Sequence, residues 1–246
     1  FPTRRSSDLL LDDSFASIAT AVMWGRSLYR NIQRFVLFQL TINFAAIVIC
    51  FVGAVFGTDM PLTVVQILWV NIIMDTFAAM AMASLPPNPE VMRDKPRPRD
   101  EFIITPAMAR TLFTCGAAMV VVLLGMLFRW TILQGGLTVE QLTVFFSTFV
   151  FLQFWNMFNA KAFNTHQSAF ARMGASIGGF GVVALLILAG QYLIVTFGGK
   201  MFNVVPLSWT DWGIIFAGTS LVLWFGELAR AFTPGKSGSR PRTVRE

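Results

Sequence analysis

Six stretches of about 20 apolar residues recur along the chain, separated by shorter polar or charged segments. They cover residues 35–56, 62–85, 107–133, 141–162, 174–197 and 209–232. A helix of about 20 residues crosses the hydrocarbon core of a bilayer, because each residue adds about 1.5 Å. The pattern therefore predicts an all-α membrane protein, a bundle of six transmembrane helices.

The connections between the stretches divide this bundle into two parts. Three of them are short enough to make the helices they join antiparallel neighbours. These are residues 57–61, 134–140 and 198–208. The segment 86–106 is longer, and its prolines and charges predict a cytosolic loop without helix. We therefore expect a hairpin at residues 31–85 and a four-helix set at residues 107–233.

Composition and charge agree with a membrane location and give an orientation. Hydrophobic residues make up 55% of the chain and the mean hydropathy is +0.63, above the 45–50% or so of soluble domains. If the N-terminus is cytoplasmic, 17 of the 19 Lys and Arg residues face the cytosol, and only Arg129 and Lys200 lie on the outer side. An excess of Lys and Arg is typical of cytoplasmic loops. Both termini are then cytoplasmic, and residues 234–246 form a basic tail near anionic lipid headgroups. The net charge of +6 is thus explained by the basic cytosolic segments of a membrane protein and does not indicate nucleic-acid binding.

The most informative polar residues lie in the middle of the second stretch. Asn71 and Asp75 are four residues apart, which places the amide and the carboxylate on one face of a helix. A carboxylate at the centre of a bilayer costs about 2.5–3.5 kcal/mol on insertion scales, so such residues usually serve ion or proton binding. No Lys or Arg at the same depth pairs with Asp75, which therefore needs a proton or a metal ion.

Amides in two other stretches are candidates to share a cation with this pair. The first stretch carries Gln39, Thr41 and Asn43, and the fourth carries Gln153, Asn156 and Asn159. Each amide alone is adequately explained by an interhelical hydrogen bond. Calcium takes 6–8 oxygens, whereas Asp75, Asn71, Asn43 and Gln153 supply about five. The missing ligands must come from water, from carbonyls of an unwound helix, or from protein outside this chain.

Four segments resemble, in order, the C-terminal third of a P-type calcium-transporting ATPase. They are LLLDDSFASIATAVMWGRSLYRNIQRF, FQLTINFAAIVICFVGAVFG, PLTVVQILWVNIIMDTFAAMAMASLPPNPEVMRDKPRPR and FLQFWNMFNAKAFN. The resemblance covers nearly everything from Leu10 to Phe232. It implies that residues 10–30 close the cytosolic phosphorylation domain and form a stalk, and that the six stretches are transmembrane helices five to ten of a type II pump.

The resemblance also implies a site. Asn71 and Asp75 match the family's sixth-helix calcium ligands, and Asn43 matches the fifth-helix asparagine. Ala46 and Gln153 stand where two-site pumps have glutamates, and Met74 stands where they have a threonine, so the likeness is to plasma-membrane-type, single-site pumps. The predicted metal residues are Asn71 and Asp75, with Asn43 and Gln153 as less certain members.

The family's catalytic parts are missing from the sequence. It contains neither a DKTGT phosphorylation motif nor a TGES segment, so we expect no catalytic residue, no resident cofactor and no ATPase activity in this chain alone. ATP and Mg²⁺ would act only in a full-length parent translocase, whose N-terminal part is the expected partner besides the lipid bilayer. The opening residues 1–9, FPTRRSSDL, equal one reading frame of a common sequencing adapter, so we expect a non-native leader on a fragment.

Two other readings remain open from the sequence. A secondary cation transporter or channel would use Asp75 as a relay without ATP, but such proteins often show repeated halves, and none is evident here. A purely structural scaffold would leave Asp75 unexplained. We expect the ion-binding part of a calcium pump in the plasma (inner) membrane, although manganese would suit the same ligands.

Overall fold

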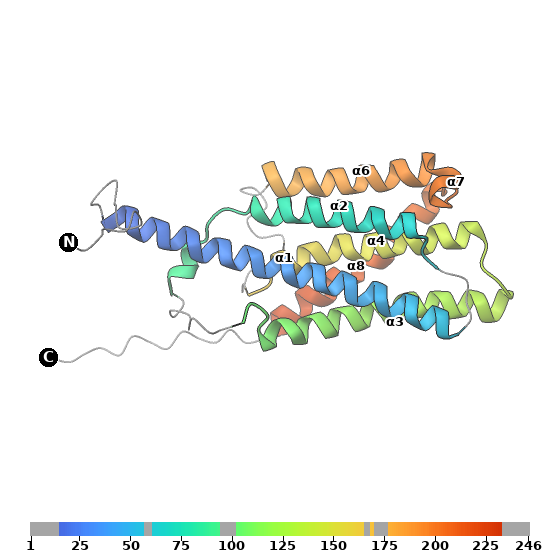
Figure 1. Ribbon diagram of the computed structural model, residues 1–246, viewed down its shortest axis with the longest axis horizontal. Coiled ribbons are helices and arrows are strands. Elements are labelled where there is room, and N and C mark those ends of the chain that lie inside the picture. Colours follow the sequence, from blue (N-terminus) through green and yellow to red (C-terminus); the bar gives the residue numbers. More distant parts are fainter. Residues whose placement is uncertain (1–14, 57–60, 94–101, 165–167, 170–176, 233–246) are drawn as a thin grey trace, which may run out of the picture.

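The computed structural model describes residues 15–56, 61–93, 102–164, 168–169 and 177–232, and the statements below concern these residues. Long helices run side by side in one bundle, and no strand occurs in the described ranges (Figure 1). They are α1 (Phe15–Val55), α2 (Val64–Ala83), α3 (Pro106–Gln134), α4 (Val139–Lys161), α6 (Val182–Phe197) and α8 (Trp209–Phe232). The prediction of an all-α membrane bundle is confirmed.

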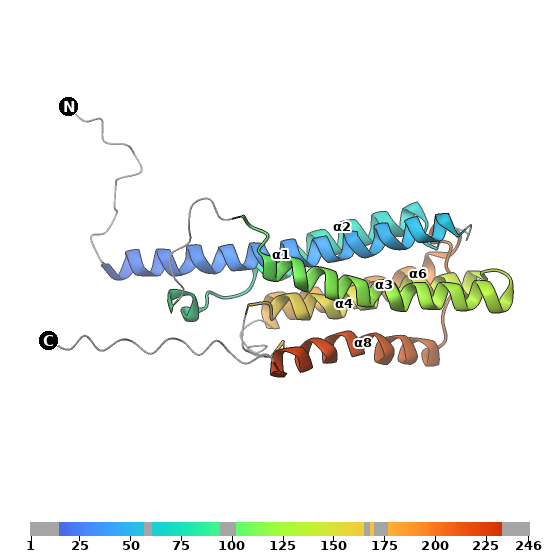
Figure 2. The same cartoon turned by 90° about the horizontal axis from the view of Figure 1, so that it is seen from below.

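Four segments of the described chain are long and apolar enough to cross a membrane by themselves. They are Phe15–Val55, Val64–Ala83, Pro106–Ile132 and Gly179–Phe197. Helices α4 and α8, which are not among these four, lie alongside them over much of the bundle's length (Figures 1 and 2). That α4 and α8 also cross the bilayer stays a prediction.

Helix α1 is too long to be a membrane span alone. Its 41 residues extend for about 60 Å, roughly twice the hydrocarbon thickness of a bilayer. The N-terminal half accordingly projects beyond the bundle, while the C-terminal half packs within it (Figure 1). The expected stalk and the expected first span are thus one continuous helix, with no break at residues 30–31.

Polar side chains fix where α2 and α4 begin. Thr63 and Gln66 form a reciprocal capping box at the start of α2, and Thr138 and Gln141 form another at the start of α4. Gln66 also donates a 2.8 Å hydrogen bond to the carbonyl oxygen of Phe202. Phe202 ends a short helix, α7 (Gly199–Phe202), inside the connection that was predicted at residues 198–208.

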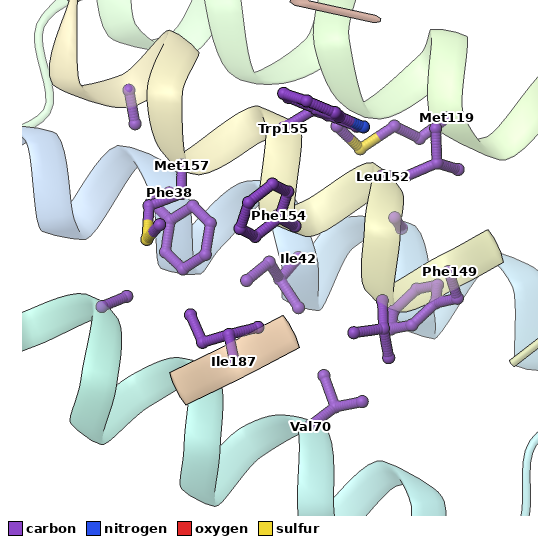
Figure 3. Packing of buried hydrophobic residues seen from close by; sticks show 14 of the residues in the cluster. Phe38, Ile42, Val70, Met119, Phe149, Leu152, Phe154, Trp155, Met157 and Ile187 are labelled. Atoms are coloured by element: carbon purple, nitrogen blue, oxygen red, sulfur yellow. The ribbon is translucent and has the colours of Figure 1, made fainter. Parts of the chain in front are cut away.

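The centre of the bundle is α4. It contacts α1, α2, α3, α6 and α8, and every residue from Phe145 to Lys161 is buried. A helix that is covered all round cannot show an apolar stripe. Figure 3 shows Phe38 and Ile42 of α1, Val70 of α2, Phe149 of α4 and Ile187 of α6 gathered around this centre.

The fifth predicted apolar stretch covers residues 174–197, and the structure describes it from Ile177 onward. There a π-helical turn, Ile177–Gly181, leads into α6. Within this turn Gly179 lies against Ser84, just after the end of α2, and an added Cβ would collide with the Ser84 side chain. Glycine therefore permits the close approach of the turn before α6 to the C-terminal end of α2.

The prediction that the loop at residues 86–106 lacks helix is wrong. Residues Pro89–Arg93 form a 3-10 helix, because proline is acceptable at the start of a helical turn, where its missing N–H is not needed. The Asn88 side chain caps the turn by accepting a hydrogen bond of 3.1 Å from the backbone nitrogen of Glu90. Residues 94–101 of the loop lie outside the described ranges.

Three buried polar residues of α1 tie its projecting half to the loops around it. Each donates to a backbone carbonyl oxygen: Asn31 to Leu85 at 3.4 Å, Gln33 to Ile103 at 3.0 Å and Arg34 to Phe163 at 3.4 Å. These carbonyls follow α2, precede α3 and follow α4, respectively. The base of the stalk and the ends of three other helices therefore form one packed unit.

Candidate cation site

Asn71 and Asp75 lie at the middle of α2, and both are half-buried. The helix continues through them from Val64 to Ala83, so the amide and the carboxylate share a face one turn apart, as predicted from their spacing. A continuous helix uses its own backbone carbonyl oxygens in hydrogen bonds. In the described structure α2 therefore offers this site only side-chain oxygens.

The closest polar neighbour of Asp75 is Gln39 of α1, whose side chain lies within hydrogen-bonding reach of the carboxylate. Oδ1 of Asp75 and Oε1 of Gln39 are both buried and have no hydrogen-bond partner. A carboxylate only accepts hydrogen bonds, so a hydrogen bond between these two side chains is donated by the amide nitrogen of Gln39. A buried carboxylate normally has all its oxygens satisfied, so the unpartnered Oδ1 needs an explanation.

Asn43 lies one turn after Gln39 on α1 and is half-buried. Four-residue spacing places the two amides on one face of that helix, and α1 packs against α2. The described structure gives the Asn43 side chain no hydrogen bond within the protein. Ala46, three residues further on, packs against the apolar core and contributes no oxygen.

Gln153 supplies a third unpartnered oxygen, from α4. Its side chain is fully buried, its nitrogen donates to Sδ of Met119 at 3.6 Å, and its Oε1 has no partner. Sulfur is a weak acceptor, so even the nitrogen is poorly satisfied. The unpartnered oxygens of Gln39, Asp75 and Gln153 thus come from α1, α2 and α4, three helices that contact one another.

The remaining amides of α4 have other roles. Asn159 donates from Nδ2 to the carbonyl oxygen of Val222 on α8 at 3.0 Å, as expected for an interhelical hydrogen bond. Asn156 is buried and presents an unpartnered nitrogen, a group that does not bind cations. Asn159 therefore serves the contact between α4 and α8.

The chemistry of the site follows from its donors. Among the described residues no three His, Cys, Asp or Glu side chains gather into a cluster, so Asp75 provides the one charged oxygen group of this set. Together with neutral amide oxygens it forms a hard, oxygen-only environment, which suits calcium and not a softer metal. Since α1, α2 and α4 run without a break, their backbone carbonyl oxygens are used within the helices and add no ligand.

Sequence reasoning named Gln39 as a polar residue but did not include it in the site. The signal was present in its spacing, because Gln39 precedes Asn43 by one helical turn, as Asn71 precedes Asp75. What the sequence lacked was the facing of α1 and α2. Only the packed hairpin shows that Gln39 adjoins Asp75.

Comparison with known proteins places this bundle in a family. A family model described as "Cation transporting ATPase, C-terminus" matches residues 59–232. The chain is similar to calcium-transporting ATPase 12, plasma membrane-type, of Arabidopsis thaliana, with 39% identity over 89% of this chain and 21% of that protein. It is also similar to plasma membrane calcium-transporting ATPase 3 of Homo sapiens, with 35% identity over 90% of this chain and 19% of that protein.

The chain therefore spans about a fifth of the length of these relatives. The family model covers most of the chain, and the helical bundle agrees with it. We conclude that the chain belongs to the family of cation-transporting ATPase C-terminal regions.

Proposed function

We propose that this chain is the ion-binding transmembrane part of an ATP-driven calcium pump, and that Asp75 and Asn71 hold the transported ion. The observation that carries the proposal is the buried, unpartnered Oδ1 of Asp75, whose side chain adjoins that of Gln39, a residue with an unpartnered oxygen of its own. A calcium ion, as substrate, would satisfy these oxygens and compensate the carboxylate charge. Asn43 and Gln153 supply further neutral oxygens.

The energy for transport comes from elsewhere in the full-length protein. ATP, Mg²⁺ and the phosphorylated group belong to the longer protein of which this chain is a part, since the sequence carries no DKTGT motif. The stalk of α1 is the physical route by which a cytosolic domain acts on the site, because one helix carries both the stalk and Gln39 and Asn43. The names of the relatives support calcium as the ion and the plasma membrane as the location.

The decisive experiment is Asp75→Asn in a full-length pump that contains this chain. The change keeps the size of the side chain but removes its charge, and hard divalent cations need charged oxygens. We expect calcium-dependent phosphorylation from ATP to be abolished, and Asn71→Ala to be nearly as severe because its oxygen lies one turn away.

The matched control is Asp211→Asn, the same substitution at the outer end of α8, where Asp211 accepts a hydrogen bond of 3.1 Å from the backbone nitrogen of Ser208. It should leave calcium-dependent phosphorylation intact. Normal calcium affinity in the Asp75→Asn pump would refute the site.

A further inference from the structure

Gln39 is a half-buried amide of α1 that adjoins the Asp75 carboxylate of α2. Its side chain lies within hydrogen-bonding reach of the Asp75 carboxylate, and its oxygen, Oε1, is buried with no hydrogen-bond partner. Most buried amides that only tether two helices have both ends satisfied. Gln66 at the start of α2 shows this: its nitrogen donates to Phe202, and its oxygen accepts from the backbone nitrogen of Thr63.

The position of the free oxygen is also specific. Gln39 Oε1 and Asp75 Oδ1 belong to two side chains that adjoin each other, and both carry negative partial charge. In a medium of low dielectric constant two such oxygens repel each other unless a positive group lies near them. None of the described hydrogen bonds provides one. A cation held by Asp75 is a positive group of this kind.

The number of oxygen ligands that calcium needs also favours a role for Gln39 in the site. The side-chain oxygens of Asp75, Asn71, Asn43 and Gln153 amount to about five, below the 6–8 that calcium takes. An oxygen from Gln39 brings the total to about six without any break in α1 or α2. Gln39 also lies one turn from Asn43, so both residues present their amides from the same face of α1.

We propose that Gln39 is a further member of the cation site, whose amide nitrogen holds one oxygen of Asp75 in place while its own oxygen is a ligand of the transported ion. This inference rests on the proposed function. It assigns Gln39 two separable roles, because the nitrogen orients the carboxylate and the oxygen contacts the ion. The two roles can be tested by removing one or both.

The experiment measures the calcium concentration for half-maximal phosphorylation from ATP in a full-length pump containing this chain. Gln39→Leu removes both roles, and we expect the half-maximal concentration to rise at least tenfold while the maximal phosphorylation level is retained. Gln39→Glu loses the donor but keeps an oxygen ligand, and we expect a rise of less than about threefold. A folding defect would lower the maximal level without shifting the calcium dependence.

The matched control is Gln191→Leu. Gln191 is also a buried amide with an unpartnered oxygen, but it lies on α6, where its nitrogen contacts Oγ of Ser147 at 3.5 Å. We expect less than a twofold change in the half-maximal calcium concentration.

The outcomes that would contradict the proposal can be told apart. An unchanged calcium dependence in Gln39→Leu, or an equal shift in Gln191→Leu, overturns the assignment of Gln39 while leaving the pump proposal intact. Equal losses in Gln39→Leu and Gln39→Glu overturn the ligand role. If Asp75→Asn itself retains normal calcium dependence, the proposed function fails, and this inference fails with it.

Discussion

Asn159 on α4 donates a hydrogen bond of 3.0 Å to the backbone carbonyl oxygen of Val222 on α8, and Gly226 lies against the same asparagine side chain. A Cβ on Gly226 would overlap the amide of Asn159. One turn earlier, Trp155 donates to Oγ1 of Thr219 at 3.2 Å. The contact between α4 and α8 is therefore a close, polar one that depends on glycine.

We predict that Gly226→Ala destabilises the bundle, because the methyl group must displace Asn159 and break its hydrogen bond. Overpacking of this kind costs about 1–3 kcal/mol. Thermal unfolding of the detergent-solubilised protein measures the effect as a lower midpoint.

The control for this prediction is Gly218→Ala on the same helix. An added Cβ at Gly218 meets no atom within 4 Å, and alanine favours helix over glycine by about 1 kcal/mol. Equal midpoints for the two variants would show that the contact between Asn159 and Gly226 is not tight.

We predict a transport stoichiometry of about one calcium ion per phosphorylation. Ala46 has no side-chain oxygen and packs against the core, and Asp75 is the single acidic side chain among the candidate ligands. One carboxylate with neutral amides balances only half the charge of a single calcium ion, so this set cannot hold two. Isotope binding to the intact pump measures the ratio, and two ions per phosphorylated site would refute the single-site proposal.

We predict that both termini and residues 86–106 lie on the cytosolic side. The motivation is the distribution of Lys and Arg, of which only Arg129 and Lys200 fall on the outer side. In intact cells, an impermeant thiol reagent should leave Arg97→Cys unlabelled and label Lys200→Cys, whose position is exposed. The opposite labelling pattern would invert the topology.

We predict that residues 1–246 by themselves hydrolyse no ATP, because the sequence contains no phosphorylation motif. The measurement is phosphate release by the purified chain with and without calcium. Boiled protein and the Asp75→Asn chain serve as background controls. A calcium-dependent rate above that background would contradict the prediction.

The sequence determined the helices and the central pair of the site. Long apolar runs specify helices in a bilayer because no other open structure satisfies the backbone there, and the observed α2, α4 and α8 begin and end within two residues of the predicted stretches. The spacing of Asn71 and Asp75 likewise fixed their common face, since it depends only on the period of the helix. The loop at residues 86–106 was less predictable, because prolines stop long helices but permit the 3-10 helix Pro89–Arg93.

The tertiary structure decided how those helices face one another. Gln39 and Gln153 carry the same side chain in similar apolar surroundings, and the sequence favoured only Gln153. In the bundle, Gln39 adjoins Asp75 while the nitrogen of Gln153 is directed at Met119. A helix's own sequence fixes which residues share a face, but the partner of that face depends on packing contacts between residues far apart in the chain. For this reason the polar pair on α2 was visible in the sequence, and its neighbour on α1 became visible only in the folded bundle.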